Sequence, residues 1–258
     1  MDHSGLVHAL TAALLAEPWA RQTPPELHEE DPRAILRGLM NLRPPVPADP
    51  ALLALQDRLL QGELAEKAVT KAGDLSPCPR HPRLVLWRGD ITTLEAGAIV
   101  NAANSALLGC FLPCHRCIDN AIHSAAGIQL RLACHALMEA QGHDEPPGGA
   151  KLTPGYNLPA RYVLHTVGPK VKGTLTQTHR DQLAGCYRSC LDLARDQGIS
   201  SVAFCCISTG VYGFPREAAA AIAVETVLEG LDRAPEIERV IFNVFEEKDY
   251  DIYHRLLY

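Results

Sequence analysis

The 258-residue sequence lacks any apolar run that approaches the roughly 20 residues of a membrane-spanning helix. Basic residues are not in excess either, because 24 lysines and arginines stand against 30 aspartates and glutamates, giving a formal charge of -6. These shortages argue against a membrane protein and against one that binds duplex nucleic acid through its phosphates. The first residues also lack the basic-then-apolar pattern of a secretory signal, so we expect a cytoplasmic protein.

A disulfide framework is not expected, because the nine cysteines are odd in number and a chain of this length does not need such bridges. Four of them lie in apolar or helical patterns typical of small buried hydrophobic residues, namely Cys186, Cys190, Cys205 and Cys206. Only Cys110, Cys114 and Cys117 lie close together in the sequence with a histidine, His115, among them. This group is therefore the candidate for metal binding.

Residues 1–75 are expected to form a helical extension. Three segments repeat apolar residues at helical spacing, and two proline-bearing stretches separate them. The segments are 6–17, 32–42 and 50–69, and the stretches are 21–26 and 43–50. Their leucine content is too high for a disordered tail. A proline-rich joint at 76–83 precedes the rest of the chain, so we divide the sequence into 1–75 and 76–258.

In residues 76–258 the pattern changes to an alternation of strands and helices. The expected strands are 83–91, 98–104, 161–168, 201–208 and 239–245. The expected helices are 117–140, 179–198 and 216–231, and the segment 249–257 closes the series. Such alternation predicts an α/β fold with a mixed, largely parallel sheet and helices on both faces.

Three of the expected strands end in polar or glycine-rich sequence. Asp90 ends the first, Asn101 and Asn104 lie at the end of the second, and a loop at 208–215 follows the fourth. Ligands of such folds bind at the carboxyl ends of the strands, so we expect these residues along one rim of the sheet. Glycines in the loop would let backbone N–H groups approach an anion. Each feature alone is also explained by ordinary turn formation.

Taken together, five segments resemble the macrodomain family. They are WRGDIT, IVNAANSAL, DNAIHSAAG, TPGYNLPARYVLHTVGP and ISTGVYGFP, in this order from about residue 83 to the C-terminus. The resemblance implies a three-layer α/β/α sandwich that binds ADP-ribose. It places Asp90 and Ile91 beside the adenine, and Asn101 and Asn104 beside the distal ribose. It places the diphosphate against a loop that consists of Ser208, Thr209, Gly210, Val211, Tyr212, Gly213 and Phe214.

The stretch GCFLPCHRC at 109–117 departs from most hydrolytic macrodomains, which carry a run of glycines there. It matches the narrower group of zinc-dependent macrodomains, which the N-terminal segments GLMNLRPPVP and LQDRLLQ resemble as well. Zinc accepts thiolate and imidazole ligands. His115 and Cys117 share one face of an extended segment, so we prefer Cys110, His115 and Cys117 as ligands, with water or substrate in the fourth position. Cys110, Cys114 and Cys117 form the alternative trio, since Cys114 and Cys117 make a CxxC pair.

The resemblance implies a hydrolase that uses Zn2+ and removes mono-ADP-ribose from modified protein side chains. Asp119 stands where hydrolytic macrodomains have a catalytic aspartate, and would activate water or orient the ribose together with Asn101 and Asn104. Its plainer role is the N-cap or first-turn acid of the following helix. His123, one turn later, is expected to be a packing histidine. Two alternative functions stay open: a non-catalytic ADP-ribose-binding module with a structural zinc, and a scaffold whose N-terminal helices dock a partner.

Overall fold

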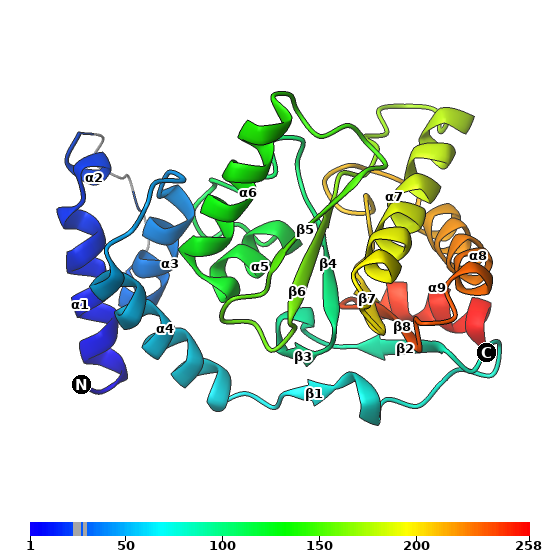
Figure 1. The fold of residues 1–258 in the computed structure, drawn as a ribbon, viewed down its shortest axis with the longest axis horizontal. Coiled ribbons are helices and arrows are strands. Elements are labelled where there is room, and N and C mark those ends of the chain that lie inside the picture. Colours follow the sequence, from blue (N-terminus) through cyan, green and yellow to red (C-terminus); the bar gives the residue numbers. More distant parts are fainter. Residues whose placement is uncertain (23–26, 28–29) are drawn as a thin grey trace.

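The N-terminal part of the chain is helical. A computed structural model describes residues 1–22, 27 and 30–258. The first four helices are α1 (His3–Ala16), α2 (Pro18–Gln22), α3 (Pro32–Leu42) and α4 (Pro50–Ala65), as Figure 1 shows. The three helical segments predicted from leucine spacing are confirmed. The proline-bearing stretch predicted at 21–26 begins within α2, and its residues 23–26 lie outside the described residues.

An aspartate begins each of the three longer N-terminal helices. Asp2, Asp31 and Asp49 cap α1, α3 and α4 by accepting a hydrogen bond from a backbone N–H group of the first turn. Proline starts α3 and α4, where its missing N–H and fixed φ do no harm. The buried leucines of α1, α3 and α4 form a small core of their own, which Ile128 of the following region joins.

The rest of the chain is built around a six-stranded sheet in the order β2-β8-β7-β4-β6-β5. The strands are β2 (Leu84–Arg88), β4 (Ala98–Ala102), β5 (Ala150–Pro154), β6 (Tyr162–Thr166), β7 (Ser201–Phe204) and β8 (Arg239–Val244). All neighbours pair in parallel except β5, which is antiparallel to β6. The five predicted strands and the mixed, largely parallel sheet are therefore confirmed.

Helices cover both faces of this sheet. They are α5 (Ile118–Ala126), α6 (Ile128–Gln141), α7 (Gln177–Asp196), α8 (Arg216–Arg233) and α9 (Glu247–Leu257). Figure 1 shows α5 and α6 on one side of the sheet and α7, α8 and α9 on the other, which is the predicted three-layer α/β/α arrangement. No described helix is long and apolar enough to span a membrane.

Four features of the fold were not predicted. The edge strand β5 was missed because its sequence AKLTP ends in a proline, a residue that edge strands tolerate. The helix expected at 117–140 is two helices, since Gly127 has φ +100 and interrupts it. The short strands β1 (Thr70–Lys71) and β3 (Leu94–Glu95) pair in parallel, and β1 lies in the region expected to be helical. Short 3-10 helices, η1 (Ala72–Asp74) and η2 (Ile91–Thr93), follow β1 and precede β3.

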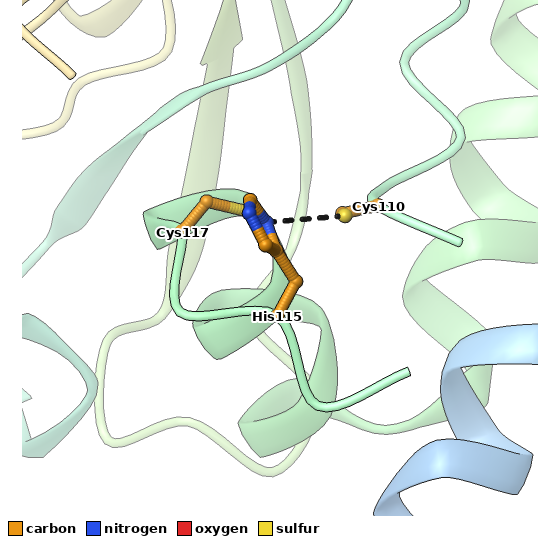
Figure 2. A group of neighbouring side chains, drawn as sticks. All are labelled: Cys110, His115 and Cys117. Atoms are coloured by element: carbon orange, nitrogen blue, oxygen red, sulfur yellow. Dashed lines mark hydrogen bonds between the residues drawn. The ribbon is translucent and has the colours of Figure 1, made fainter. Parts of the chain in front are cut away.

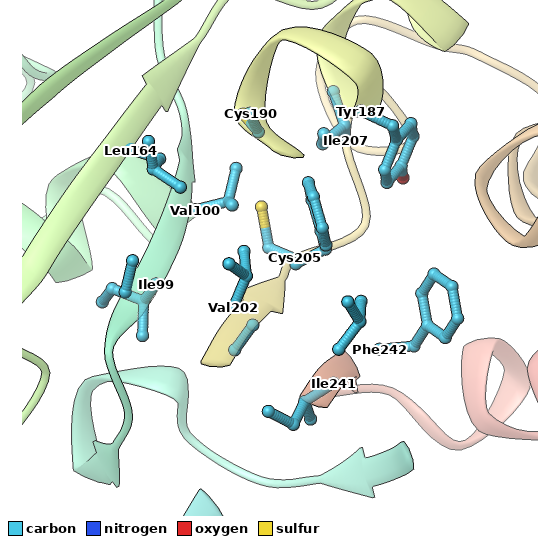
Figure 3. Packing of buried hydrophobic residues seen from close by; sticks show 14 of the residues in the cluster. Ile99, Val100, Leu164, Tyr187, Cys190, Val202, Cys205, Ile207, Ile241 and Phe242 are labelled. Atoms are coloured by element: carbon cyan, nitrogen blue, oxygen red, sulfur yellow. The ribbon is translucent and has the colours of Figure 1, made fainter. Parts of the chain in front are cut away.

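The main core lies between the sheet and its helices. Figure 3 shows Ile99, Val100 and Leu164 of β4 and β6 beside side chains of β7, β8 and α7. Cys190 and Cys205 are part of this core, and Cys186 is buried as well, as expected for small apolar residues. Cys206 is only partly buried. No disulfide joins any two of the nine cysteines, all of which lie within the described residues.

Candidate active site at the carboxyl edge of the sheet

The polar residues that follow the parallel strands share one edge of the sheet. Asp90 follows β2, Asn104 follows β4, and the segment 205–215 follows β7. Because β2, β8, β7, β4 and β6 all run in the same direction, their carboxyl ends meet at that edge. The predicted common rim is therefore confirmed.

Asn101, Asn104 and Asp119 form one hydrogen-bonded cluster. The Nδ2 group of Asn101 donates to Oδ1 of Asp119 at 2.9 Å, and Nδ2 of Asn104 donates to Oδ2 at 3.2 Å. Asp119 is only 5% exposed. Burial raises the pKa of its carboxyl group to about 6, although the two amides and the charge of Arg131 act in the opposite direction. The cluster thus fixes both oxygens of one desolvated carboxyl group.

The N-cap of α5 is Cys117, not Asp119. The Sγ atom of Cys117 accepts a hydrogen bond from the backbone N–H of Asn120 at 3.3 Å. Asp119 lies in the first turn, where a negative charge is favourable near the helix N-terminus. The plainer role predicted for Asp119 is therefore wrong as to the cap and correct as to the first-turn acid.

His165 of β6 contacts the cluster through Asn101. Its Nδ1 lies 3.2 Å from Nδ2 of Asn101, and its Nε2 lies 2.9 Å from Oγ1 of Thr153. These partners assign the proton to Nε2, because Nδ1 must accept from the amide. Burial lowers the pKa of His165 to about 3, so the ring is neutral at pH 7. Asn101 is consequently held in place on both sides, by Asp119 and by His165.

His123 is buried as expected of a packing histidine, but it is not satisfied. Neither ring nitrogen has a hydrogen-bond partner among the described residues. Its Nε2 lies 3.5 Å from Oδ1 of Asp119, and burial lowers its pKa well below the usual value. Gly109 leaves room for the ring, since a Cβ atom at that position would lie 2.9 Å from His123.

Cys110, His115 and Cys117 come together directly before α5, as Figure 2 shows. Their Sγ and ring-nitrogen atoms lie within 4.8 Å of one another, and no fourth ligand side chain joins this group in the described part of the chain. A tetrahedral zinc ion with usual bond lengths holds a sulfur and a nitrogen about 3.5 Å apart. Sγ of Cys110 and Nδ1 of His115 are 3.6 Å apart, so this pair of ligand atoms has the separation that such an ion requires.

Cys114 turns away from this trio. Its Sγ donates to the carbonyl oxygen of Ala34 at 3.2 Å, and its backbone N–H donates to Oδ1 of Asn41 at 3.0 Å. Both partners belong to α3. Cys114 also has φ +54, a left-handed conformation that is uncommon for residues other than glycine. The arrangement therefore favours His115 over Cys114 as a ligand.

The loop after β7 presents backbone N–H groups. Ser208 and Gly213 have φ +65 and +69, and the loop is closed by a hydrogen bond from the N–H of Phe214 to the carbonyl of Ser208 at 3.0 Å. No described acceptor pairs with the N–H groups of residues 209–212. Lys170 Nζ lies 4.8 Å from the centre of the Tyr212 ring. Unpaired amides beside a cation can bind an anion.

The remaining predicted loop and adenine residues differ in exposure. Within the loop, Phe214 is buried whereas Val211 is 83% exposed. Asp90 is exposed, and its Oδ1 caps η2 by accepting from the N–H of Thr92 at 2.9 Å. Ile91 packs into the main core. The contacts of Asp90 and Ile91 with adenine stay a prediction.

Arg131 of α6 is a site residue that the sequence analysis missed. Its Nε donates to the carbonyl of Leu108 at 2.6 Å, and its guanidinium lies 4.1 Å above the ring of Phe111. It is buried, which lowers its pKa to about 10, while the charge of Asp119 counteracts this shift. The only signal in the sequence is an arginine inside the apolar helical run IQLRLACHAL.

A mixed sheet with an asparagine pair, a buried aspartate and an amide-lined loop at one edge defines the macrodomain class. Residues 100–223 match the family described as Macro domain. The chain is 49% identical over 231 residues to a protein of Treponema medium named protein-ADP-ribose hydrolase, covering 89% of this chain and 88% of that one. This chain therefore belongs to the macrodomain family, as its resemblance implied.

Two further relatives agree with this assignment. A protein of Staphylococcus aureus, also named protein-ADP-ribose hydrolase, is 48% identical over 225 residues, which cover 87% of this chain and 84% of that one. Among solved structures, a Trypanosoma brucei macrodomain in complex with ADP-ribose has a TM-score of 0.67 and 34% identity. That match covers 89% of this chain and 97% of the other. Because residues 76–258 make up only about seven tenths of the chain, the similarity extends beyond the sheet into the N-terminal helical region.

Proposed function

We propose that this chain is a zinc-dependent hydrolase that removes mono-ADP-ribose from modified protein side chains and releases ADP-ribose. One observation carries the proposal: the trio Cys110, His115 and Cys117 stands immediately before the Asp119 cluster at the start of α5. The names of the two hydrolase relatives support the reaction, and the ADP-ribose complex of a third supports the ligand.

In the proposed complex, ADP-ribose lies along the carboxyl edge of the sheet. Its diphosphate accepts hydrogen bonds from the N–H groups of residues 209–212, at the loop that leads into the N-terminus of α8. Its distal ribose reaches Asn104, which is only half-buried, and the adenine lies toward Asp90 at the end of β2. This order matches the order of the strands, since β2 and β4 lie on either side of β8 and β7.

Hydrolysis adds water to C1 of the distal ribose and breaks the bond from C1 to the protein side chain, which leaves with a proton. Cys110, His115 and Cys117 would hold a zinc ion, which would act as a Lewis acid and stabilise negative charge on an oxygen of the substrate. Asp119 orients the distal ribose, because its two oxygens are fixed by Asn101 and Asn104. The buried position of Asp119 strengthens that polar contact by excluding water.

Removal of the metal tests this function against the non-catalytic alternative. We expect about one zinc ion per purified chain, loss of hydrolysis of a mono-ADP-ribosylated protein on chelation, and unchanged binding of free ADP-ribose. Cys117→Ala should lose zinc and hydrolysis together. Cys78→Ala is the matched control, because Cys78 is buried beside the start of β2 and away from the trio.

Two results would contradict the proposal. A chelated protein that still hydrolyses its substrate at the original rate would remove zinc from the reaction. A zinc-loaded protein that binds ADP-ribose but never releases it from any defined Asp, Glu, Ser or Arg linkage would be a binding module with a structural zinc. The measurements are metal analysis, calorimetric titration with ADP-ribose and mass spectrometry of the modified protein.

A further inference from the structure

Helix α3 of the N-terminal extension contacts the segment 109–117, here called the metal loop. Asn41 accepts from the backbone N–H of Cys114 at 3.0 Å, and Ala34 accepts from the Cys114 thiol at 3.2 Å. Nη2 of Arg37 donates to the carbonyl of His115 at 3.4 Å. These contacts span about 75 residues of sequence, so they are tertiary contacts and not part of a local turn.

Arg37 also reaches the metal loop through Asn120 of α5. Its Nη2 and Nε donate to Oδ1 of Asn120 at 2.7 and 3.2 Å. Asn120, which is fully buried, donates from Nδ2 to the carbonyl of Leu112 at 3.0 Å. Its backbone N–H donates to Sγ of Cys117 at 3.3 Å. The buried amide side chain of Asn120 thus links Arg37 to the metal loop. The backbone of Asn120 also contacts Cys117, one of the proposed ligands.

The network closes through Asn41. Its Nδ2 donates to Oγ of Ser124 at 3.0 Å, and that hydroxyl donates to Oδ1 of Asn120 at 3.2 Å. Asn41, Asn120 and Ser124 are all buried. In a buried network the loss of one member leaves its partners without hydrogen bonds, which costs more than the bond itself. Removing Arg37 or Asn41 therefore disturbs the hydrogen bonds that hold the metal loop in place.

The conformation of Cys114 explains what α3 achieves. Its φ of +54 is unfavourable by about 1 kcal/mol for a residue with a side chain. Asn41 and Ala34 fix Cys114 in this conformation and direct its thiol to α3. The next residue, His115, is then directed to Cys110, 3.6 Å away. The contact with α3 thus determines that His115, and not Cys114, lies beside Cys110 and Cys117.

We propose that Arg37 and Asn41 are positioning residues for the metal ion, so that the N-terminal extension sets the affinity of the site for zinc. The inference rests on the zinc site of the proposed function. Residues that orient metal ligands without touching the metal typically change metal affinity by about 10- to 100-fold. Arg37 and Asn41 orient the trio from a separate helix with its own small core.

The test compares zinc dissociation constants of full-length variants, measured by competition with a chromophoric chelator. Arg37→Gln and Asn41→Ala should each weaken zinc binding by about 10-fold or more. Arg33→Gln is the matched control on the same helix, because Arg33 pairs with Glu63 of α4 at 2.8 Å and makes none of the loop contacts described above. It should change zinc affinity by less than twofold. The affinity for ADP-ribose should stay close to that of the unmodified chain.

Arg37→Lys keeps the charge but cannot make both bonds to Asn120, so it should give an intermediate affinity, and it replaces Arg37→Gln should that variant fail to fold. An unmodified chain that binds zinc tightly, with Arg37→Gln and Asn41→Ala within twofold of it, would overturn this inference alone. An equal loss of affinity in Arg33→Gln would also overturn it, since the effect would then be a general one of the extension. An unmodified chain that binds no zinc would overturn both this inference and the zinc dependence of the proposed function.

Discussion

The two asparagines beside Asp119 differ in what surrounds them. Asn101 is fully buried and contacts both Asp119 and His165, so it belongs to the core as well as to the site. Asn104 is half-buried and contacts Asp119 and the carbonyl of Gly109 at the edge of the metal loop. In the proposed complex, the same residue type would therefore serve both stability and ligand contact at position 101, and mainly ligand contact at position 104.

This difference predicts separable effects of two alanine substitutions. Asn104→Ala should lower kcat for hydrolysis by about 100-fold, because it removes a fixed donor at the reacting end of the ligand, with little change in the free energy of unfolding. Asn101→Ala should lower the free energy of unfolding by about 2 kcal/mol as well, since it removes one hydrogen-bond partner from the buried Asp119 and one from the buried His165. Rates from single turnovers and urea unfolding measure the two effects. Equal losses of stability in both variants would refute the distinction.

Burial of His165 predicts a pH dependence of stability. The pKa of His165 is about 3 in the folded protein, against about 6.5 in an unfolded chain. His165 therefore binds a proton in the unfolded state but not in the folded state, and stability is lost as the pH falls below about 6.5. At pH 5 this linkage amounts to about 2 kcal/mol. Its partners Asn101, Thr153 and Cys134 do not titrate in this range. Asp119, with a pKa of about 6, and His123, whose pKa burial also lowers, make pH-dependent contributions of their own.

His165→Gln removes the titrating group and keeps a donor and an acceptor in its place. Urea unfolding of both zinc-free proteins at pH 7, 6 and 5 should show a fall in stability between pH 7 and 5 that is smaller in the variant by about 2 kcal/mol. His123 and Asp119 are present in both proteins, so their contributions cancel in the difference. Parallel curves for the two proteins would show that His165 does not carry this linkage.

At the scale of elements, the break between α5 and α6 anchors the N-terminal extension. Gly127 separates the helices with φ +100, and the following N–H, of Ile128, donates to Oε1 of Gln56 on α4 at 2.8 Å. A Cβ atom at Gly127 would lie 2.5 Å from Nε2 of Gln56. Glycine is thus needed at this position for two reasons: its backbone conformation and the close approach of α4.

Gly127→Ala should therefore cost more than an alanine at a glycine that has only the backbone constraint. Gly142 ends α6 with φ +76 and has open space around its Cβ position, so Gly142→Ala should cost about 1 kcal/mol. Gly127→Ala should cost about 2 kcal/mol more, because the contact with Gln56 must also give way. Equilibrium unfolding in urea compares the two variants, and equal costs would mean that α4 adapts without penalty.

At the scale of the whole molecule, the sequence predicts the parts that repeat or follow one another closely. Leucine spacing predicts α1, α3 and α4, and the alternation of apolar runs predicts five strands with their shared edge. The spacing of Cys110, His115 and Cys117 predicts a trio that the fold brings together. The edge strand β5 and the break at Gly127 escape this reasoning, because a short polar strand and a single glycine give no periodic signal.

The missed site residues have a different cause. Arg37 and Asn41 contact residues about 80 positions away, and His165 contacts Asn101 from the neighbouring strand, 64 positions away. Nothing in the local sequence around an arginine or histidine reports such a partner, which is set by the packing of α3 on α5 and by the order of the strands. Site residues within one loop could be predicted, whereas those that support the loop could not.

Because α3 and the metal loop are hydrogen-bonded to each other, zinc should stabilise the chain beyond the loop itself. An ion present at 1,000 times its dissociation constant stabilises a folded protein by about 4 kcal/mol if it does not bind the unfolded chain. Chelation should raise amide hydrogen exchange in the metal loop and in the last turn of α3, where Asn41 contacts Cys114.

Exchange in α8, which packs on α7 and α9 in the other layer, should stay unchanged. In Cys117→Ala, chelation should alter exchange nowhere. Increased exchange in the metal loop without an increase in α3 would show that α3 does not respond to the metal. Increased exchange throughout the sheet would show that the metal stabilises the fold as a whole.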